Sequence, residues 1–264
     1  MPPPIFGAQV YTIRDFIKTV PDFARSMQKL RAIGYTAVQL DLEHHPDVPA
    51  SDIKRITDDV GLQICITHFG YDLFLHDLDA IIKRQQIWAC TNTAIVAMPG
   101  RYHAAGEDGY RRFAAEATQI GEKLAAVGIT LSYHNHSYEF VRFGQRTGLE
   151  ILFAESDARY LQAELDTYWV QHGGGDPVAW IGRLAKRMPV IHLKDMAILP
   201  DGAQVFAEVG EGNLNWSAIL AACEAADVTW AVVEQDVCRR DPFESLGISY
   251  AHLAAYYSMT RADQ

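Results

Sequence analysis

Ionisable residues two positions apart mark three places in the second half of the sequence. These pairs are Glu164 and Asp166, His192 and Lys194, and Glu234 and Asp236. Further imidazoles precede them at His68 and in the segment YHNHSYEF, residues 133–140. Carboxylates and imidazoles bind hard or borderline divalent ions such as Mn2+, Mg2+, Co2+ or Zn2+, and they also transfer protons. These residue types therefore predict a site that combines one divalent ion with acid–base chemistry.

Each of these groups ends or follows a short apolar run of the kind that forms a buried strand. The predicted strands are residues 6–11, 37–40, 63–67, 93–98, 130–133, 162–165, 190–193 and 230–233. Helical periodicity between them predicts helices at residues 21–33, 50–60, 78–89, 108–127, 177–186, 216–225 and 242–257, with a shorter crossover near 149–155. Gly34, Gly61 and Gly128 follow helices and precede strands, as C-terminal caps do.

Eight strand–helix units in one chain predict an α/β fold, a single-domain (β/α)8 TIM barrel over residues 1–264. A doubly wound open sheet is the alternative, but residues 9–14 after the first strand contain no GxGxxG phosphate loop. The glycines at 173–175 are expected to open the sixth helix.

Active sites of TIM barrels lie at the carboxyl ends of the strands, where the polar groups of this sequence fall. Side chains two apart on a strand share a face, so Glu164, Asp166, His192 and Lys194 are predicted to point into the barrel. We expect Asp166 and His192 at the height of the ligands and Lys194 nearer the mouth.

Composition excludes several classes of partner. The 33 acidic against 23 basic residues give a net charge of −10, which disfavours nucleic acid. No run of 18 apolar residues and no signal-peptide pattern occur in the sequence, so we expect a cytoplasmic protein without a membrane partner. The four cysteines form no CxxC pair, and three lie in apolar stretches as reduced core thiols.

Purely structural roles compete with these assignments. The predicted ligands could form a buried ring of salt bridges, although an acidic excess with few cations is costly to bury without a metal. Asp195 could cap the turn after its strand, and Glu164 could pair with a basic neighbour. His172 and His252 are expected to be surface or core residues.

At these residues the sequence resembles the sugar phosphate isomerase/epimerase family of xylose isomerase-like TIM barrels. The resemblance spans nearly the whole chain through the motifs GAQVYTIRD, ITHF, YHNHSYEF, LDTYWVQHGGGDP, HLKDM, VGEGNLNW, VVEQD and ISYAHL. It implies one divalent ion held by Glu, Asp, His and Glu, with Asp166, His192 and Glu234 in three of these places. Many members carry a glutamate where this chain has His134. In the YHNHxxEF branch, which this chain resembles, Glu139 is the expected fourth ligand.

The resemblance also implies an isomerase or epimerase of a sugar or keto-sugar, acting by removal of a proton next to a carbonyl that the metal polarises. Proposed proton carriers are Glu139, Glu234 and His134, and proposed substrate contacts are His68, His136, Trp169, Lys194 and Glu211. The alternative is a lyase or dehydratase of a keto-sugar, a 3-keto-glycoside or an inosose, because both reactions share their first step.

Two other classes of protein fit the sequence less well. A DNA repair nuclease of this superfamily would need more metal ligands and a basic groove, and a sugar-binding protein without activity would need no proton carriers. The sequence contains no clear phosphate-binding loop, and a homodimer is one expected assembly.

Overall fold

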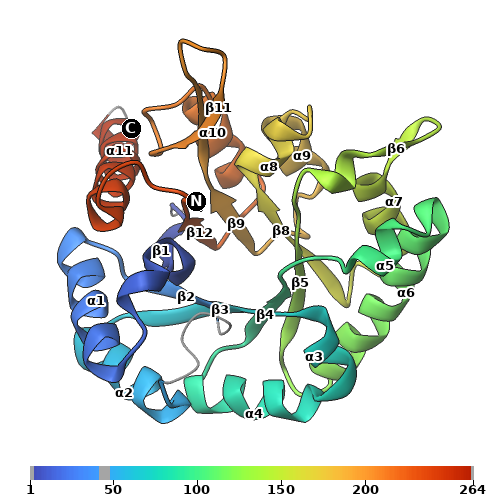
Figure 1. Ribbon diagram of the computed structural model, residues 1–264, viewed down its shortest axis with the longest axis horizontal. Coiled ribbons are helices and arrows are strands. Elements are labelled where there is room, and N and C mark those ends of the chain that lie inside the picture. The colour runs from blue at the N-terminus through green and yellow to red at the C-terminus, as the bar shows by residue number, and fades with distance from the viewer. Residues whose placement is uncertain (1–2, 42–47, 263–264) are drawn as a thin grey trace.

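Eight short strands surround the centre of the protein in the computed structural model, which describes residues 3–41 and 48–262 (Figure 1). They are β1 (Ile5–Gln9), β2 (Ala37–Asp41), β3 (Gln63–Phe69), β4 (Asn92–Ile95), β5 (Thr130–His134), β8 (Leu161–Asp166), β9 (Val190–Leu193) and β12 (Trp230–Val233). Neighbouring strands pair in parallel, and β1 pairs with β12 to close the barrel. The TIM barrel prediction is therefore confirmed, since an open sheet would leave β1 and β12 as edges.

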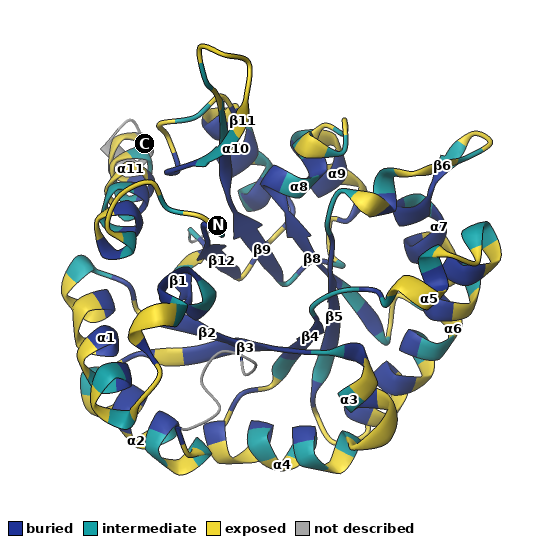
Figure 2. Ribbon diagram, in the orientation of Figure 1, coloured by how far each residue is buried: buried dark blue, intermediate teal, exposed yellow. Residues whose placement is uncertain are grey.

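Helices cover the outside of the barrel and turn their apolar sides toward it (Figure 2). In α1, for example, Phe23, Met27 and Leu30 are buried at helical spacing, and the Thr19 side chain accepts a hydrogen bond from Asp22 N at the N-terminus. The helices are α1 (Val20–Ile33), α2 (Ala50–Val60), α3 (Tyr71–His76), α4 (Leu78–Trp88), α5 (Gly100–His103), α6 (Gly106–Ala125), α7 (Gly148–Glu155), α8 (Thr167–His172), α9 (Pro177–Arg183), α10 (Trp216–Ala225) and α11 (Pro242–Ala262).

The barrel interior has an apolar layer and a polar layer. A cluster of buried side chains includes Ala37, Val190 and Val232, each two residues before a polar residue that lies in the same strand or directly follows it. Side chains two apart share a face, so this apolar layer lies directly below Gln39, His192 and Glu234. Leu165 and Leu193 belong instead to the core between barrel and helices. The apolar layer thus closes the barrel beneath the polar groups, which lie at its carboxyl end.

Several predicted boundaries differ from the structure. β1 ends at Gln9, whose side-chain oxygen accepts from Tyr11 N and starts the 3-10 segment η1 (Val10–Phe16). β4 ends at Ile95 and α11 runs to Ala262. The three glycines at 173–175 connect α8 to α9 and open neither, and Asp176 caps α9. Local polar contacts and tertiary packing, which periodicity does not register, determine these ends.

Two small hairpins interrupt the βα loops and were not predicted. One consists of β6 (Arg142–Phe143) and β7 (Arg146–Thr147), and the other of β10 (Asp195–Ile198) and β11 (Gln204–Ala207). Both project from the barrel in Figure 1. Their strands are only two to four residues long, and their apolar runs of at most three residues are shorter than those that predict a buried strand.

All four cysteines are free thiols, and Cys65, Cys90 and Cys223 are buried as the sequence predicts. Across residues 3–41 and 48–262, the helices are too short or too polar to cross a membrane.

Candidate metal centre

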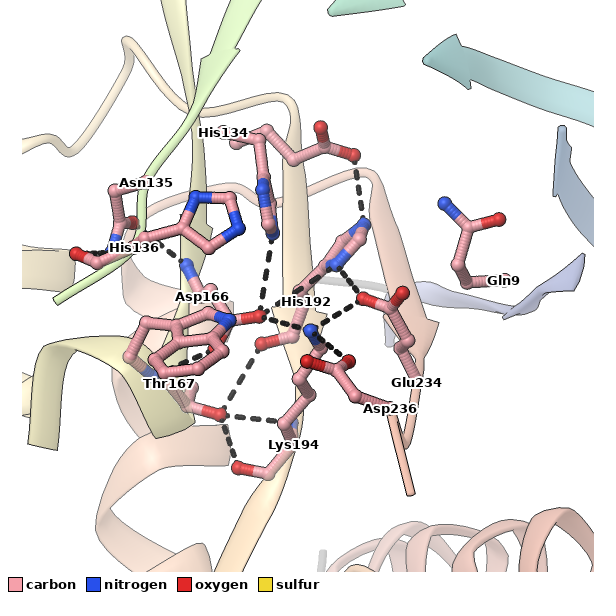
Figure 3. A network of polar contacts seen from close by, with 12 residues as sticks. Gln9, His134, Asn135, His136, Asp166, Thr167, His192, Lys194, Glu234 and Asp236 are labelled. Atoms are coloured by element: carbon pink, nitrogen blue, oxygen red, sulfur yellow. Dashed lines mark hydrogen bonds and ion pairs between the residues drawn. The ribbon is translucent and has the colours of Figure 1, made fainter. Parts of the chain in front are cut away.

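Four side chains from different strands converge at the carboxyl end of the barrel. His134 ends β5, Asp166 ends β8, His192 lies in β9 and Glu234 follows β12. The register sets Asp166 opposite His192. One donor atom from each of the four lies within 4.8 Å of the other three, and all four residues are buried (Figure 3). Two imidazoles and two carboxylates could hold one divalent ion here.

Lys194 lies between the carboxylates of this group. Its Nζ is 2.7 Å from Glu234 Oε2, 3.2 Å from Asp166 Oδ2 and 2.7 Å from Asp236 Oδ1 (Figure 3). Burial opposes the charge of the ammonium, but the carboxylates outweigh burial and raise the pKa of Lys194 well above its usual value. The site thus already attracts a cation at the point where the carboxylates converge.

His192 contacts a different partner with each ring nitrogen. Nδ1 is 2.8 Å from Glu234 Oε2, and Nε2 is 2.6 Å from Gln39 Oε1. Burial opposes a positive ring, yet Glu164 and Glu234 together raise the pKa of His192 to about 10. A metal at Nδ1 would therefore replace a proton.

His134 is the second imidazole of the group. Its Nε2 is 3.4 Å from Asp166 Oδ2, and its Nδ1 is 3.3 Å from the carbonyl oxygen of Val96. Burial lowers the pKa of His134, which leaves the ring neutral near pH 7. Neutral imidazole is the form that binds metals, so the donor set fits a divalent ion in both number and chemistry.

Glu139 lies apart from the converging donors. It sits in the 3-10 turn η2 (Tyr138–Phe140), where Oε1 accepts from the Tyr133 hydroxyl at 2.5 Å and Oε2 accepts from His136 N at 2.9 Å. Burial raises the pKa of Glu139 to about 8 despite these hydrogen bonds. Among the described residues, it is His134 that groups with Asp166, His192 and Glu234, at the position where the resemblance expects a glutamate. Ligation by Glu139 stays a prediction.

Two predicted substrate contacts, His136 and Trp169, lie next to each other and form an aromatic wall beside the cluster. The ring centroids of His136 and Trp169 are 5.4 Å apart, and Lys194 Nζ lies 5.8 Å from the Trp169 ring. Asp166 Oδ1 accepts from Trp169 N at 2.9 Å, which ties the wall to the candidate ligand.

Two further predicted contacts, His68 and Glu211, lie in different surroundings. His68 is buried beside His134 and His192, with Nε2 2.6 Å from Glu164 Oε2. Glu211 is exposed and accepts a hydrogen bond from Arg240 at 2.9 Å, so its carboxylate lies at the protein surface. Contact of these residues with a substrate stays a prediction.

Three polar residues that contact His68, His192 or Lys194 were absent from the predicted site. Gln9 and Gln39 are fully buried in β1 and β2, and Asp236 binds Lys194. An amide within an apolar strand, as Gln39 is in AVQLD, was the signal that could have indicated a residue facing the barrel interior.

Asp195 follows Lys194 but points to other partners. Its carboxylate accepts hydrogen bonds from five N–H groups, namely Met196 N, Gly210 N, Gly212 N, Leu214 N and Trp216 Nε1. It is fully buried, and it holds the loop that leads from β11 to α10. The alternative prediction that Asp195 caps a turn therefore matches its contacts. Its donors extend from Met196 to Trp216, which is a longer segment than a single turn.

Comparison with known proteins agrees with the barrel fold. The model of the family described as xylose isomerase-like TIM barrel matches residues 27–253. Rhizopine catabolism protein MocC of Rhizobium meliloti is 23% identical over 263 residues, covering 86% of this chain and 78% of that protein. Inosose dehydratase of Lacticaseibacillus casei is 26% identical over 159 residues, which is 52% of this chain and 51% of that enzyme.

Solved structures share the fold at low sequence identity. A sugar phosphate isomerase/epimerase from Parabacteroides distasonis superposes with a TM-score of 0.77 and 22% identity, covering 97% of this chain and 95% of its own. An L-ribulose 3-epimerase gives a TM-score of 0.74 and 14% identity, covering 98% of this chain and 96% of its own.

Proposed function

The chain belongs to the xylose isomerase-like TIM barrel family, and from this premise we propose that it is a divalent-metal-dependent isomerase or epimerase of a sugar or keto-sugar. The observation that carries the proposal is the convergence of His134, Asp166, His192 and Glu234 at the carboxyl end of the barrel. Similarity to an L-ribulose 3-epimerase supports the reaction class.

We assign the metal to these four side chains, with Glu139 as the alternative to His134. When bound, the ion would polarise a carbonyl of the substrate and lower the pKa of the adjacent C–H bond. The two imidazoles favour Mn2+, Co2+ or Zn2+ over Mg2+, which prefers oxygen ligands.

Residues of the chain then carry the proton and orient the sugar. Glu234 contacts its neighbours through Oε2 and can present Oε1 to a C–H bond as the base. Lys194, held protonated by the carboxylates, can donate a hydrogen bond to a hydroxyl. His136 and Trp169 offer ring faces on which a sugar can pack. If Glu139 takes the fourth ligand position, the neutral His134 becomes free to accept a proton.

A lyase or dehydratase is the second candidate, and it is supported by the different residue types on the two sides of the site. The cluster holds one glutamate, with His134 in place of a second, so the two faces of a substrate would meet different groups. Elimination uses such a pair, because one group takes the C–H proton while another protonates the leaving oxygen. Inosose dehydratase is among the relatives.

Incubation of the metal-loaded protein with a panel of keto-sugars, 3-keto-glycosides and inososes in D2O tests the proposal. Deuterium incorporation beside the carbonyl, with an isomeric product and no lost group, supports the isomerase or epimerase. Release of water or an aglycone supports the lyase instead.

The controls separate site chemistry from general damage. Glu234→Gln should abolish the exchange, whereas Glu122→Gln, at an exposed position of α6, should leave it unchanged. If the loaded protein neither exchanges nor eliminates with any of these substrates, or if purified protein binds no divalent ion, the proposal is wrong.

A further inference from the structure

A second buried group of metal-binding side chains lies against the first. Donor atoms of His68, Glu164 and His192 also converge within 4.8 Å, and all three residues are buried. His192 belongs to both groups through opposite ring nitrogens. Nδ1 faces Glu234 and Asp166 (Figure 3). Nε2 faces Glu164 and Gln39. Which of the two ring nitrogens keeps a proton therefore decides which group can use His192 to bind a metal.

Hydrogen bonds in the second group run in one direction. Gln9 Nε2 donates to His68 Nδ1 at 3.4 Å, which leaves His68 Nε2 to donate to Glu164 Oε2 at 2.6 Å. Glu164 Oε1 lies 3.0 Å from His192 Nε2, and Gln39 Oε1 lies 2.6 Å from the same nitrogen. Both atoms near Nε2 are acceptors, so Nε2 keeps its proton when a metal replaces the proton on Nδ1.

These contacts do not suit a second ion. Both nitrogens of His68 are engaged, one as acceptor and one as donor, so binding an ion there would break the hydrogen bond to Glu164. Glu164 is completely buried, and it compensates the imidazoles that it touches. Oε1 of Glu164 makes no hydrogen bond with the described residues, and its contact with His192 Nε2 is an ion pair.

We propose that Glu164, oriented by His68, is a positioning residue that holds the proton on Nε2 of His192 and presents Nδ1 to the metal. The inference rests on the proposed metal site. A carboxylate behind a ligating histidine sets the tautomer and the direction of the ring, and its loss weakens metal binding. Sequence reasoning leaves Glu164 open as a partner for a basic residue, and the structure identifies two imidazoles as its partners.

The test is a metal titration of the full chain with Zn2+ and Mn2+ by calorimetry, compared between the unchanged protein and two variants. Glu164→Gln should weaken binding by about ten- to a hundredfold. The matched control is Glu116→Gln, because Glu116 in α6 accepts hydrogen bonds from Tyr71 and Tyr102 outside the barrel, and it should leave the affinity unchanged. Equal affinity of Glu164→Gln and the unchanged protein overturns the inference, whereas absence of binding by the unchanged protein overturns the proposed function.

A second measurement needs no variant to fold. Long-range 1H–15N spectra of the Zn2+-loaded protein, labelled at histidine, should show His192 bound through Nδ1 and protonated at Nε2. Two ions per chain, or His192 bound through Nε2, would show that the second group is itself a metal site and would reject the positioning role.

Discussion

Lys194 and Asp195 are neighbours in the chain, yet each is the centre of a different buried polar group. Around Lys194, three carboxylates share one flexible ammonium. Around Asp195, one carboxylate is held by five N–H donors, four from the backbone and one from an indole. Backbone donors cannot leave, whereas an ammonium at the end of a long side chain can be displaced. The comparison indicates a structural role for Asp195 and an exchangeable cation beside Asp166 and Glu234.

Replacing Asp195, the centre of the group held by five N–H donors, should have the largest effect on the free energy of unfolding. Asp195→Ala leaves several buried N–H groups unpaired and is expected to lower the free energy of unfolding by about 3–5 kcal/mol. Urea unfolding of the metal-free protein measures this loss. Asp166→Asn keeps a side-chain oxygen for Trp169 N, so its loss of stability should be clearly smaller. Equal losses would remove the distinction between the two groups.

The same Asp166→Asn variant should show its main effect on the metal. Loss of a charged ligand is expected to weaken Zn2+ binding by at least about a hundredfold, beyond the range for residues behind the ligands. Competition with a chelating dye measures the affinity. Parallel titration of His134→Ala and Glu139→Gln identifies the fourth ligand. A loss in the first variant alone assigns His134, and a loss in the second alone restores Glu139.

Removing the ammonium of Lys194 should change the metal affinity in the opposite direction to Asp166→Asn. Lys194→Met eliminates a positive charge next to the proposed ion and is expected to strengthen metal binding by about tenfold or more. The same dye competition measures it, with Lys123→Met at an exposed position of α6 as the control. Weaker binding by the Lys194 variant would mean that the ammonium holds the carboxylates in place rather than competing for them.

Glu139 represents a third environment, in which one hydroxyl and one backbone N–H hold a buried carboxyl group. Its pKa is raised from 4.5 to about 8, so the folded state keeps the proton to higher pH than the unfolded state does. Its contribution to stability is complete below pH 4.5 and is lost as pH rises to 8.

Urea unfolding between pH 5 and 7 compares the unchanged protein with Glu139→Gln. The difference in unfolding free energy should fall by at most about 1.4 kcal/mol per pH unit. A difference that does not change with pH would indicate that Glu139 is ionised in the fold, as a metal ligand would be.

The local sequence pattern was sufficient to predict the barrel architecture of this protein. Alternating apolar runs and helical periods predicted the eight strands of the barrel, and the two-residue spacing of Glu164 with Asp166 and of His192 with Lys194 predicted their common direction. These features depend on side-chain periodicity along one segment, which the sequence contains directly.

Contacts between distant segments were decided only by the tertiary structure. His134 reaches Asp166 because β5 pairs with β8, and Gln39 of β2 reaches His192 of β9 through the barrel interior. The turn after β5 directs Glu139 to Tyr133 instead of the cluster. Asp195 and Lys194 also look alike in sequence as polar residues after one strand. Their opposite roles depend on which atoms surround each side chain once the chain has folded, and a few ångströms decide between a hydrogen bond to the backbone and an ion pair.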